Sequence, residues 1–302
     1  MELWIPITLF AAFAQNLRFM LQKHLKDTRL STGGATFSRF VFAAPLALLL
    51  VVVLLGSGFR DWPGVSAPFF VYAAIGGLGQ ITGTMLVVAL FAERNFTVGI
   101  TLKKTETMQT ALLSLIILGE RVSAWGLVAI AIGLAGVVLL ADPPKGAQAR
   151  PWKKRLFNKA SGYGLAAGAS FGVSATGYRG ASLLLDSGDF LIRAAVTLAF
   201  VTLFQSLVMA LWLRWREVGQ VSAVLRSWRV TALVGLCGVL GSFCWFMAFN
   251  LQNAAYVKAL GQVELVFTFL ASCLVFKEKS TARELTGIAL VVASILVLVL
   301  SL

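Results

Sequence analysis

Five ionisable side chains lie inside otherwise apolar stretches of the sequence, where a charged group needs either a function or an internal partner. They are Lys103, Lys104, Glu106, Lys258 and Glu264. If these stretches cross a bilayer, a charge near its centre costs at least about 2.5–3.5 kcal/mol on insertion scales. Ammonium groups bind carboxylates and phosphates strongly, and carboxylates bind ammonium groups. The five residues therefore indicate a site for a charged solute.

Two polar stripes contain the glutamates and repeat at a distance of 158 residues. Residues four apart share one helix face, so Glu106, Thr110 and Ser114 align. The corresponding residues of the second stripe are Glu264, Thr268 and Ser272. We predict a substrate site along these stripes, with Lys103 and Lys258 beside it. The alternative is polar contact between helices, in which Lys103 pairs with Glu106 three residues on.

Three arginines lie within about two turns of the ends of apolar stretches, where each could bind substrate or extend to the lipid headgroups. They are Arg18, Arg39 and Arg193. Arg39 and Arg193 correspond at an offset of 154 residues, which favours a binding role for both. Gln15, Arg18 and Gln22 share one helix face, which lines a cavity or packs against another helix.

Two aromatic residues are also candidates for the substrate site. Trp245 and Phe246 belong to the apolar stretch that precedes Lys258. We predict that they form an apolar wall of the substrate site, and the alternative is ordinary contact with lipid or core.

The elements that hold these residues are ten apolar segments, each near the roughly 20 residues that a helix needs to span a hydrocarbon core. Their approximate ranges are 3–22, 34–55, 68–91, 96–118, 124–140, 160–183, 190–212, 230–250, 254–276 and 284–301. The polar stretch 141–159 is predicted to be a linker between a first domain, residues 1–140, and a second, residues 160–302. Because each domain has an odd number of helices, the second enters the membrane from the opposite side. The prediction is an all-α membrane protein with two inverted five-helix repeats.

Composition supports this class and excludes others. Of the 302 residues, 58% are apolar and 13% are charged, whereas soluble domains are nearer half apolar and a quarter charged. The net charge of +13 would suggest nucleic acid as partner in a soluble protein. Here most Lys and Arg residues lie in short loops between apolar segments, so we expect a lipid bilayer and no nucleic acid.

The distribution of basic residues predicts the orientation. Most Lys and Arg residues outside the segments fall in the loops after the first, third, fifth, seventh and ninth segments, whereas Arg60, Arg121 and Arg179 are assigned to the other side. Basic loops stay in the cytoplasm. We expect a multi-pass protein of the plasma or inner cell membrane, with a cytoplasmic linker 141–159 and both termini external.

Several motifs resemble those of the EamA-type transporters of the drug/metabolite transporter superfamily. These are Arg39 and Arg193, the corner Leu118-Gly119-Glu120-Arg121-Val122-Ser123, and the corner Phe276-Lys277-Glu278-Lys279-Ser280-Thr281. Lys277 replaces the glycine usual before that glutamate. The resemblance implies ten helices, an inverted five-plus-five repeat, and export of amino acids, drugs or other metabolites. From helix electrostatics, we expect Glu120 and Glu278 to cap the following helices.

Signatures of enzymes are absent from the sequence. The one histidine, His24, lies in a loop, and all five aspartates lie in loops or at helix ends. No glycine-rich phosphate loop with Lys-Ser/Thr occurs. We expect no catalytic residues, no metal and no cofactor. Three alternative functions remain. The first is a lipid or lipid-linked-sugar flippase, the second is a membrane-embedded enzyme acting on lipid, and the least favoured is a channel.

The predicted function is a secondary transporter that exports small metabolites, such as amino acids or organic anions, by alternating access. The helix-embedded cations outnumber Glu106 and Glu264, which favours substrates with a carboxylate or phosphate. Protons or a counter-substrate are candidate coupling partners. Lys103 lies one turn from Glu106, whereas Glu264 has no basic residue three or four positions away in its own helix. Glu264 is therefore the predicted proton carrier.

Overall fold

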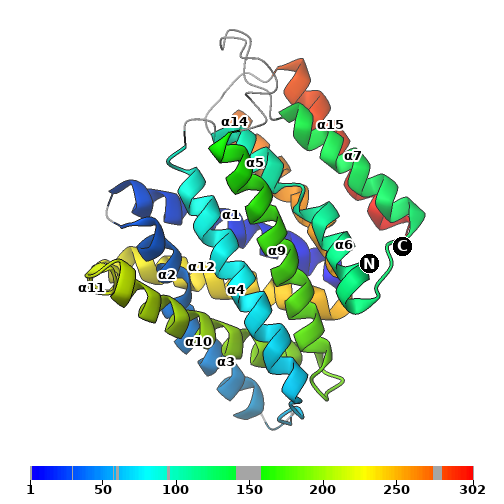
Figure 1. The fold of residues 1–302 in the computed structure, drawn as a ribbon. Coiled ribbons are helices and arrows are strands. Elements are labelled where there is room, and N and C mark those ends of the chain that lie inside the picture. Colours follow the sequence, from blue (N-terminus) through cyan, green and yellow to red (C-terminus); the bar gives the residue numbers. More distant parts are fainter. Residues whose placement is uncertain are drawn as a thin grey trace.

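The computed structural model describes residues 2–28, 30–56, 58, 61–93, 96–140, 158–274 and 281–301 (Figure 1). Its named elements are all helices. In the first half these are α1 (Trp4–Thr28), α2 (Thr32–Val41), α3 (Ala43–Gly56), α4 (Ala67–Leu90), α5 (Phe96–Lys103), α6 (Glu106–Leu118) and α7 (Ala124–Leu140). In the second half they are α9 (Lys159–Leu183), α10 (Phe190–Arg216), α11 (Gln220–Arg226), α12 (Trp228–Leu251), α13 (Ala254–Leu260), η1 (Gly261–Val263), α14 (Glu264–Leu274) and α15 (Ala282–Leu300).

Each range in which the sequence predicts a span contains helix, and five helices of the described residues meet length and hydropathy criteria for crossing a membrane. They are Thr32–Gly56, Ala67–Leu90, Phe190–Arg216, Trp228–Leu251 and Ala282–Leu300. Most of the predicted linker, residues 141–157, lies outside the described residues. The second corner does too, apart from Thr281.

Three predicted spans are interrupted rather than continuous. The first break, at Phe42, separates α2 from α3 and has a local cause, because Pro45 has no N–H to donate to the carbonyl of Val41. The second separates α5 from α6 at Lys104 and Thr105. There the backbone tightens, and the N–H of Thr105 donates to the carbonyl of Leu102 over 3.1 Å.

The third break occupies the corresponding place in the second half. After α13 the chain forms the short 3₁₀ turn η1, and α14 then begins at Glu264. Glu106 likewise is the first residue of α6. Both glutamates of the predicted stripes thus begin a helix segment, where the positive end of the helix dipole favours a carboxylate.

The helices of the two halves pack reciprocally. The helix α4 lies along α9, and α1 lies along α12. Further contacts across the two halves join α3 with α10, α6 with α13, and α7 with α15. Figure 1 shows α4 and α9 side by side across the middle of the molecule and α7 paired with α15 at one edge. Each half is therefore held mainly by helices of the other.

Glycines allow the closest of these approaches. A Cβ atom added at Gly177 of α9 would lie 2.9 Å from the Cα of Gly76 in α4. One added at Gly164 would lie 2.1 Å from the carbonyl oxygen of Gly99 in α5. Any side chain at either position would force the helices apart, so glycine sets the distance between these backbones.

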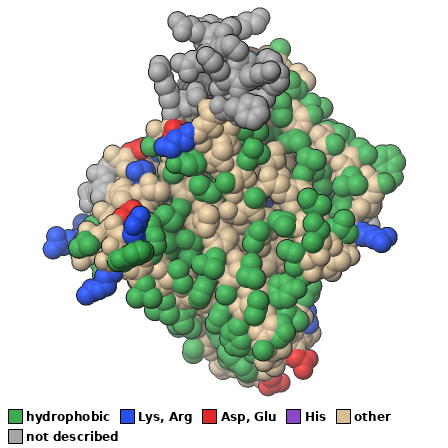
Figure 2. Space-filling model, viewed as in Figure 1, with side chains coloured by type: hydrophobic (Ala, Val, Ile, Leu, Met, Phe, Trp, Pro, Cys, Tyr) green, Lys and Arg blue, Asp and Glu red, His purple; other side chains and the backbone are tan. Residues whose placement is uncertain are grey.

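The outer surface is that of a membrane protein. Leucines, isoleucines and valines of α3, α6, α7 and α10 are exposed, among them Ile116 and Leu211 at 70%. Figure 2 shows apolar side chains over the visible face, while Lys and Arg side chains lie mostly at its edges. An apolar exterior of this extent matches hydrocarbon as the surrounding solvent.

Candidate functional site

A cluster of three lysines and two glutamates lies where the interrupted helices meet; we call it the lysine cluster. Lys103 Nζ is 3.1 Å from Glu106 Oε2, and Lys258 Nζ is 3.6 Å from Glu106 Oε1. Lys104 Nζ donates to Glu264 Oε1. The lysines and Glu106 are buried, and Glu264 is partly exposed. The cluster carries one more positive than negative charge.

Two of these ion pairs cross between the halves of the chain. Lys104 precedes α6 in the first half and pairs with Glu264 in the second. Lys258 of α13, in the second half, lies beside Glu106 of the first. Each glutamate therefore takes a lysine from the opposite half, in addition to the pair with Lys103 that the sequence suggested.

The ion pair of Lys104 with Glu264 weakens the argument by which the sequence distinguished Glu264 from Glu106 as the proton carrier. The sequence comparison considered only residues in the helix of Glu264, where it has no basic neighbour. The structure supplies Lys104 from a different helix and Gln15 from α1, whose Nε2 is 3.2 Å from Glu264 Oε2. Both glutamates are thus close to lysine, so proximity to lysine does not distinguish them.

Aromatic rings cover Lys258. Its Nζ lies 4.8 Å from the ring centroid of Trp245, 5.8 Å from Phe171 and 6.0 Å from Phe249. Such distances give favourable cation–π contacts. The indole fits because Gly261 leaves room, since a Cβ there would come within 2.5 Å of the Trp245 ring. Trp245 Nε1 is buried and has no hydrogen-bond partner among the described residues, so the described part of the site offers one unused donor.

Two narrow cavities lie on either side of Trp245 and Lys258, and Gln15 also borders both. One extends into the lysine cluster and reaches Glu106 and Glu264. The free volumes are about 20 Å³ and about 10 Å³, which is room for about one water molecule each. A metabolite would need these walls to move apart.

The other cavity leads away from the lysines to a polar end. Tyr178 donates to Gln80 Oε1 over 3.0 Å, and Gln205 Nε2 lies 2.9 Å from the same oxygen. Ser242 also borders this cavity. Its Oγ accepts from Arg39 Nη2 over 3.2 Å. The cavity thus has a lysine end, an aromatic wall that includes Phe246, and an uncharged polar end backed by an arginine.

The structure separates the predicted arginines. Arg39 is buried in α2 beside the cavity wall, with a second hydrogen bond to Thr84 Oγ1 over 3.1 Å. Arg193 instead lies in the first turn of α10 and is partly exposed. The contacts described for Arg193 involve its backbone, which accepts from Thr197 Oγ1, and do not reach the lysine cluster. Arg39 and Arg193 correspond in the sequence, yet their surroundings in the structure differ.

In the first polar stripe, Thr110 and Ser114 have different surroundings from Glu106. Thr110 donates to the carbonyl of Glu106 over 2.7 Å, and Ser114 lies 3.2 Å from Thr176 Oγ1 of α9. These hydroxyls therefore contact their own helix and α9 rather than the cavities. In the second stripe, the side chains of Thr268 and Ser272 lie outside the described residues.

An ion pair away from the lysine cluster joins the first corner to the second half. Arg179 of α9 has its Nη2 2.6 Å from Glu120 Oε1. Its Nη1 also donates to the carbonyl of Gln252 over 2.7 Å, just after α12. The described partner of Glu120 is thus Arg179, and its role as a cap of the following helix stays a prediction. Glu278 lies outside the described residues.

The sequence singled out Lys104 as a charge inside an apolar stretch but did not place it in the substrate-binding set, and it did not single out Phe171 or Gln262. Gln262 Nε2 donates to Thr107 Oγ1 over 3.0 Å and joins η1 to α6. The signal available was the polar pair before each glutamate, Lys103-Lys104 in one half and Gly261-Gln262 in the other. Runs of polar residues inside a span favour interrupted helices that line a cavity.

The comparisons with known proteins concern the second half and the fold. Residues 160–300 match the family model described as "EamA-like transporter family". No curated protein matches the chain significantly. One solved structure, described only as "Crystal structure of protein", aligns with a TM-score of 0.70 and 16% identity over 99% of this chain and 96% of that one. At this identity the likeness concerns the fold alone.

Proposed function

Residues 160–300 form an EamA-like transporter family domain, of the drug/metabolite transporter superfamily, and from this premise we propose that the protein is a secondary transporter exporting a small metabolite by alternating access. It would carry an amino acid or organic anion across the plasma or inner cell membrane. The proposed architecture is ten spans in two inverted five-helix repeats, residues 1–140 and 160–302, joined by a cytoplasmic linker.

The contacts between helices support an inverted repeat. Exchanging the halves maps the pair α4 and α9 onto the pair α12 and α1, and both pairs pack along their lengths. The same exchange maps the contact of α3 with α10 and the contact of α7 with α15 onto themselves. A pseudo-twofold relation between the halves predicts this set of contacts, and a chain of unrelated helices does not.

The observation that carries the proposal is the reciprocal pairing of Lys104 with Glu264 and of Lys258 with Glu106. It brings charges from both halves to one buried point between them, where transporter sites lie. The excess positive charge favours a carboxylate or phosphate on the substrate. A zwitterion also fits, because a glutamate can receive its ammonium group while Trp245 Nε1 donates to an oxygen.

The same pairs provide a mechanism for coupling. Rocking of the two halves would stretch the cross-half pairs, and an entering anion would compensate the lysines in their place. A conformation that separated Lys104 from Glu264 would remove the positive charge that favours the ionised carboxylate. Glu264 therefore remains our proposed proton carrier, with Lys103, Thr110, Thr268, Arg39 and Arg193 in the proposed substrate-binding set.

Transport itself is the first test. We would compare metabolites of cells with and without the protein, then load the candidates into proteoliposomes. The expected result is movement of an unaltered anionic or zwitterionic solute, weakened in Lys103→Gln and Lys258→Gln but not in the exposed control Arg226→Gln. Chemical conversion of the solute would indicate an enzyme. Equal transport by parent and both lysine variants would contradict the assigned site.

Proton coupling has its own test. In proteoliposomes with an imposed pH gradient, Glu264→Gln should lose the response to the gradient, because glutamine keeps the shape and one acceptor oxygen of the side chain and cannot titrate. Glu93→Gln serves as control, since Glu93 pairs with the exposed Lys159. A response equal to that of the parent would remove Glu264 as proton carrier.

Orientation is tested with reporters. A fusion after Leu302 that is active only in the cytoplasm should be silent, and one in the linker 141–159 should be active. The reverse pattern would overturn the orientation and leave the repeat untouched.

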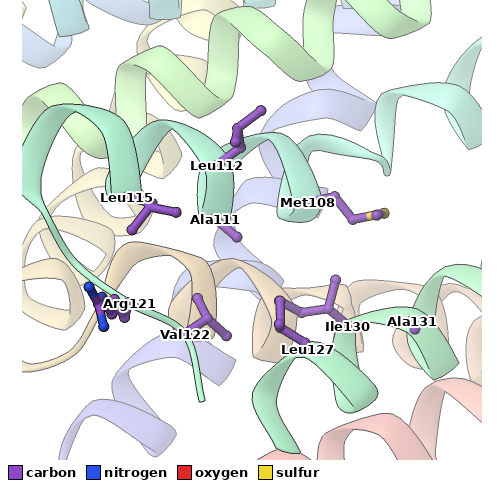
Figure 3. Close-up of a pocket in the computed structure, with 9 residues that line it drawn as sticks. All are labelled: Met108, Ala111, Leu112, Leu115, Arg121, Val122, Leu127, Ile130 and Ala131. Carbon is purple, nitrogen blue, oxygen red and sulfur yellow. The ribbon is translucent and has the colours of Figure 1, made fainter. Parts of the chain in front are cut away.

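A second candidate function, lipid flipping, is favoured by one observation. An apolar cavity of about 680 Å³ separates α6 from α7, with Leu112 and Leu127 on its two sides and Arg121 at one end (Figure 3). Leu112 and Leu127 are themselves more than half exposed, so the cavity borders the surrounding lipid. A fluorescent-lipid assay in liposomes discriminates, because a flippase speeds exchange between leaflets and a metabolite exporter does not.

A further inference from the structure

A second group of buried cations lies apart from the lysine cluster, and no carboxylate of the described residues pairs with it; we call Arg18 and Arg39 the arginine pair. Arg18, in α1, is 2% exposed, and Arg39, in α2, is 4% exposed. Arg18 Nη1 donates to Gln22 Oε1 over 2.5 Å, while Arg39 donates to Thr84 and Ser242. Among the residues that the structure describes, these acceptors are all neutral.

The two guanidinium stems meet at one glycine of α12. A Cβ added at Gly238 would lie 3.4 Å from Arg39 Cγ and 3.7 Å from Arg18 Cδ. The stems of two cationic side chains thus approach one another in the interior. Each guanidinium lies over the ring of the next residue, Arg18 Cζ at 4.1 Å from the Phe19 centroid and Arg39 Cζ at 5.4 Å from the Phe40 centroid. Arg18 Nη2 is buried and has no hydrogen-bond partner within the described part of the chain.

The described contacts of the arginine pair do not include the opposite charge that a buried cation usually has. Buried charges in proteins are paired, because an isolated one loses its hydration without compensation. A guanidinium presents several N–H donors in a planar fork that fits a carboxylate or phosphate. Two adjacent guanidiniums, one with an unused donor, therefore have the chemistry of an oxyanion site.

The arginine pair is also connected to the substrate site. Ser242, which accepts from Arg39, borders the cavity that Lys258 borders from its other end. Gln15, one turn before Arg18 in α1, borders the same cavity and contacts Glu264. An anion in the cavity would reach Arg39 by displacing a single hydroxyl contact.

We infer that Arg18 and Arg39 form a second anion-binding point of the protein, which takes a carboxylate or phosphate group. The inference rests on the proposed transport function and adds to it that recognition occurs at two cationic points, one at the lysine cluster and one at the arginine pair. The anionic group comes either from the second acid of a diacid substrate or from a free anion bound beside the substrate.

The experiment measures binding rather than transport. Purified protein is unfolded thermally in detergent with increasing acetate, phosphate or succinate, at constant ionic strength set by a large organic sulfonate. A bound anion stabilises the folded state in a saturable way. Arg18→Gln and Arg39→Gln should raise the apparent dissociation constant about ten- to a hundredfold, the loss of a charge-assisted contact. Arg226→Gln, at an exposed position, should leave it unchanged.

Comparison of the probe anions in the parent and the variants distinguishes the two possible sources of the anionic group. If the pair receives the second acid of a diacid, succinate binds more tightly than acetate and depends on Lys258 as well as on both arginines. If it receives a free anion, acetate or phosphate binds equally in Lys258→Gln and parent. Arg18→Lys and Arg39→Lys keep the charge and guard against misfolding, and they should bind with intermediate affinity.

The inference is overturned if parent and both glutamine variants show the same anion dependence, or if no probe stabilises the parent in a saturable way. Either result leaves the transport proposal intact, because that proposal is judged by solute movement in proteoliposomes. Failure of transport with arginine-dependent anion binding would conversely remove the transporter and keep the site.

Discussion

The two buried groups of basic residues differ in how their charge is compensated. In the lysine cluster, Glu106 and Glu264 neutralise lysines that come partly from the opposite half of the chain. In the arginine pair, the described partners are a glutamine and two hydroxyls. The difference indicates two roles. A cation that has an internal carboxylate fixes the arrangement of helices, whereas a cation without one is suited to a ligand from outside.

The largest expected effect comes from removing the carboxylate that serves two lysines. Glu106→Gln leaves Lys103 and Lys258 without a counter-charge, and breaking a buried ion pair costs about 3–5 kcal/mol. The free energy of unfolding, measured by steric trapping in micelles, should fall by that order. A loss below about 1 kcal/mol would mean that the lysine cluster does not hold the helices together. The structural role that distinguishes it from the arginine pair would then be wrong.

A smaller effect is expected for the pair between Lys104 and Glu264. Glu264 is partly exposed and also contacts Gln15, so either single substitution to glutamine should cost less than Glu106→Gln. The double variant should recover part of the loss, with a coupling energy of about 1–3 kcal/mol in a double-mutant cycle. Additive losses would show that the two side chains do not interact across the halves.

Trp245 lies between the two groups and should affect binding more than stability. Trp245→Phe keeps an aromatic face for Lys258 and removes the free N–H donor. A lost hydrogen bond of about 1 kcal/mol corresponds to a roughly fivefold weaker half-saturation for transport. Trp228→Phe, at an exposed position, is the matched control. An unchanged half-saturation would exclude Trp245 Nε1 as a substrate donor.

The smallest stability change is expected in the arginine pair. Arg18→Gln removes a charge that lacks a carboxylate, so nothing of opposite sign is left unpaired. In anion-free buffer its free energy of unfolding should lie within about 1 kcal/mol of the parent or above it. A loss as large as that of Glu106→Gln would mean that Arg18 stabilises the helices, and the two groups would no longer differ.

Hydropathy predicted where helices lie but not where they are interrupted. It reports how apolar a segment is, and the segments around Glu106 and Glu264 remain apolar on average although the backbone breaks beside each glutamate. The breaks are stabilised by contacts from other helices, such as Gln262 with Thr107, which no local pattern contains. The break before Pro45 differs, because proline itself removes a backbone hydrogen bond of the helix.

Residue type indicated which buried charges cluster in the structure, but it did not indicate their partners. Charged residues in apolar segments are rare enough to identify Lys103, Glu106, Lys258 and Glu264 directly. Their pairing depends on which helices pack together, and so the link from Lys104 to Glu264 could not be derived from spacing. Correspondence at a fixed offset was also insufficient, because Arg39 is buried beside the cavity wall whereas Arg193 lies at a helix start.

The contact between Gly99 and Gly164 bears on which parts of the protein move together. With backbone touching backbone there, α5 cannot slide along α9 without a collision, although the two helices belong to different halves of the chain. The break at Lys104 and Thr105 lies just beyond that contact, between α5 and α6. We therefore expect a hinge inside the first half of the chain, and a rigid body of the working protein that combines segments of both halves instead of coinciding with either.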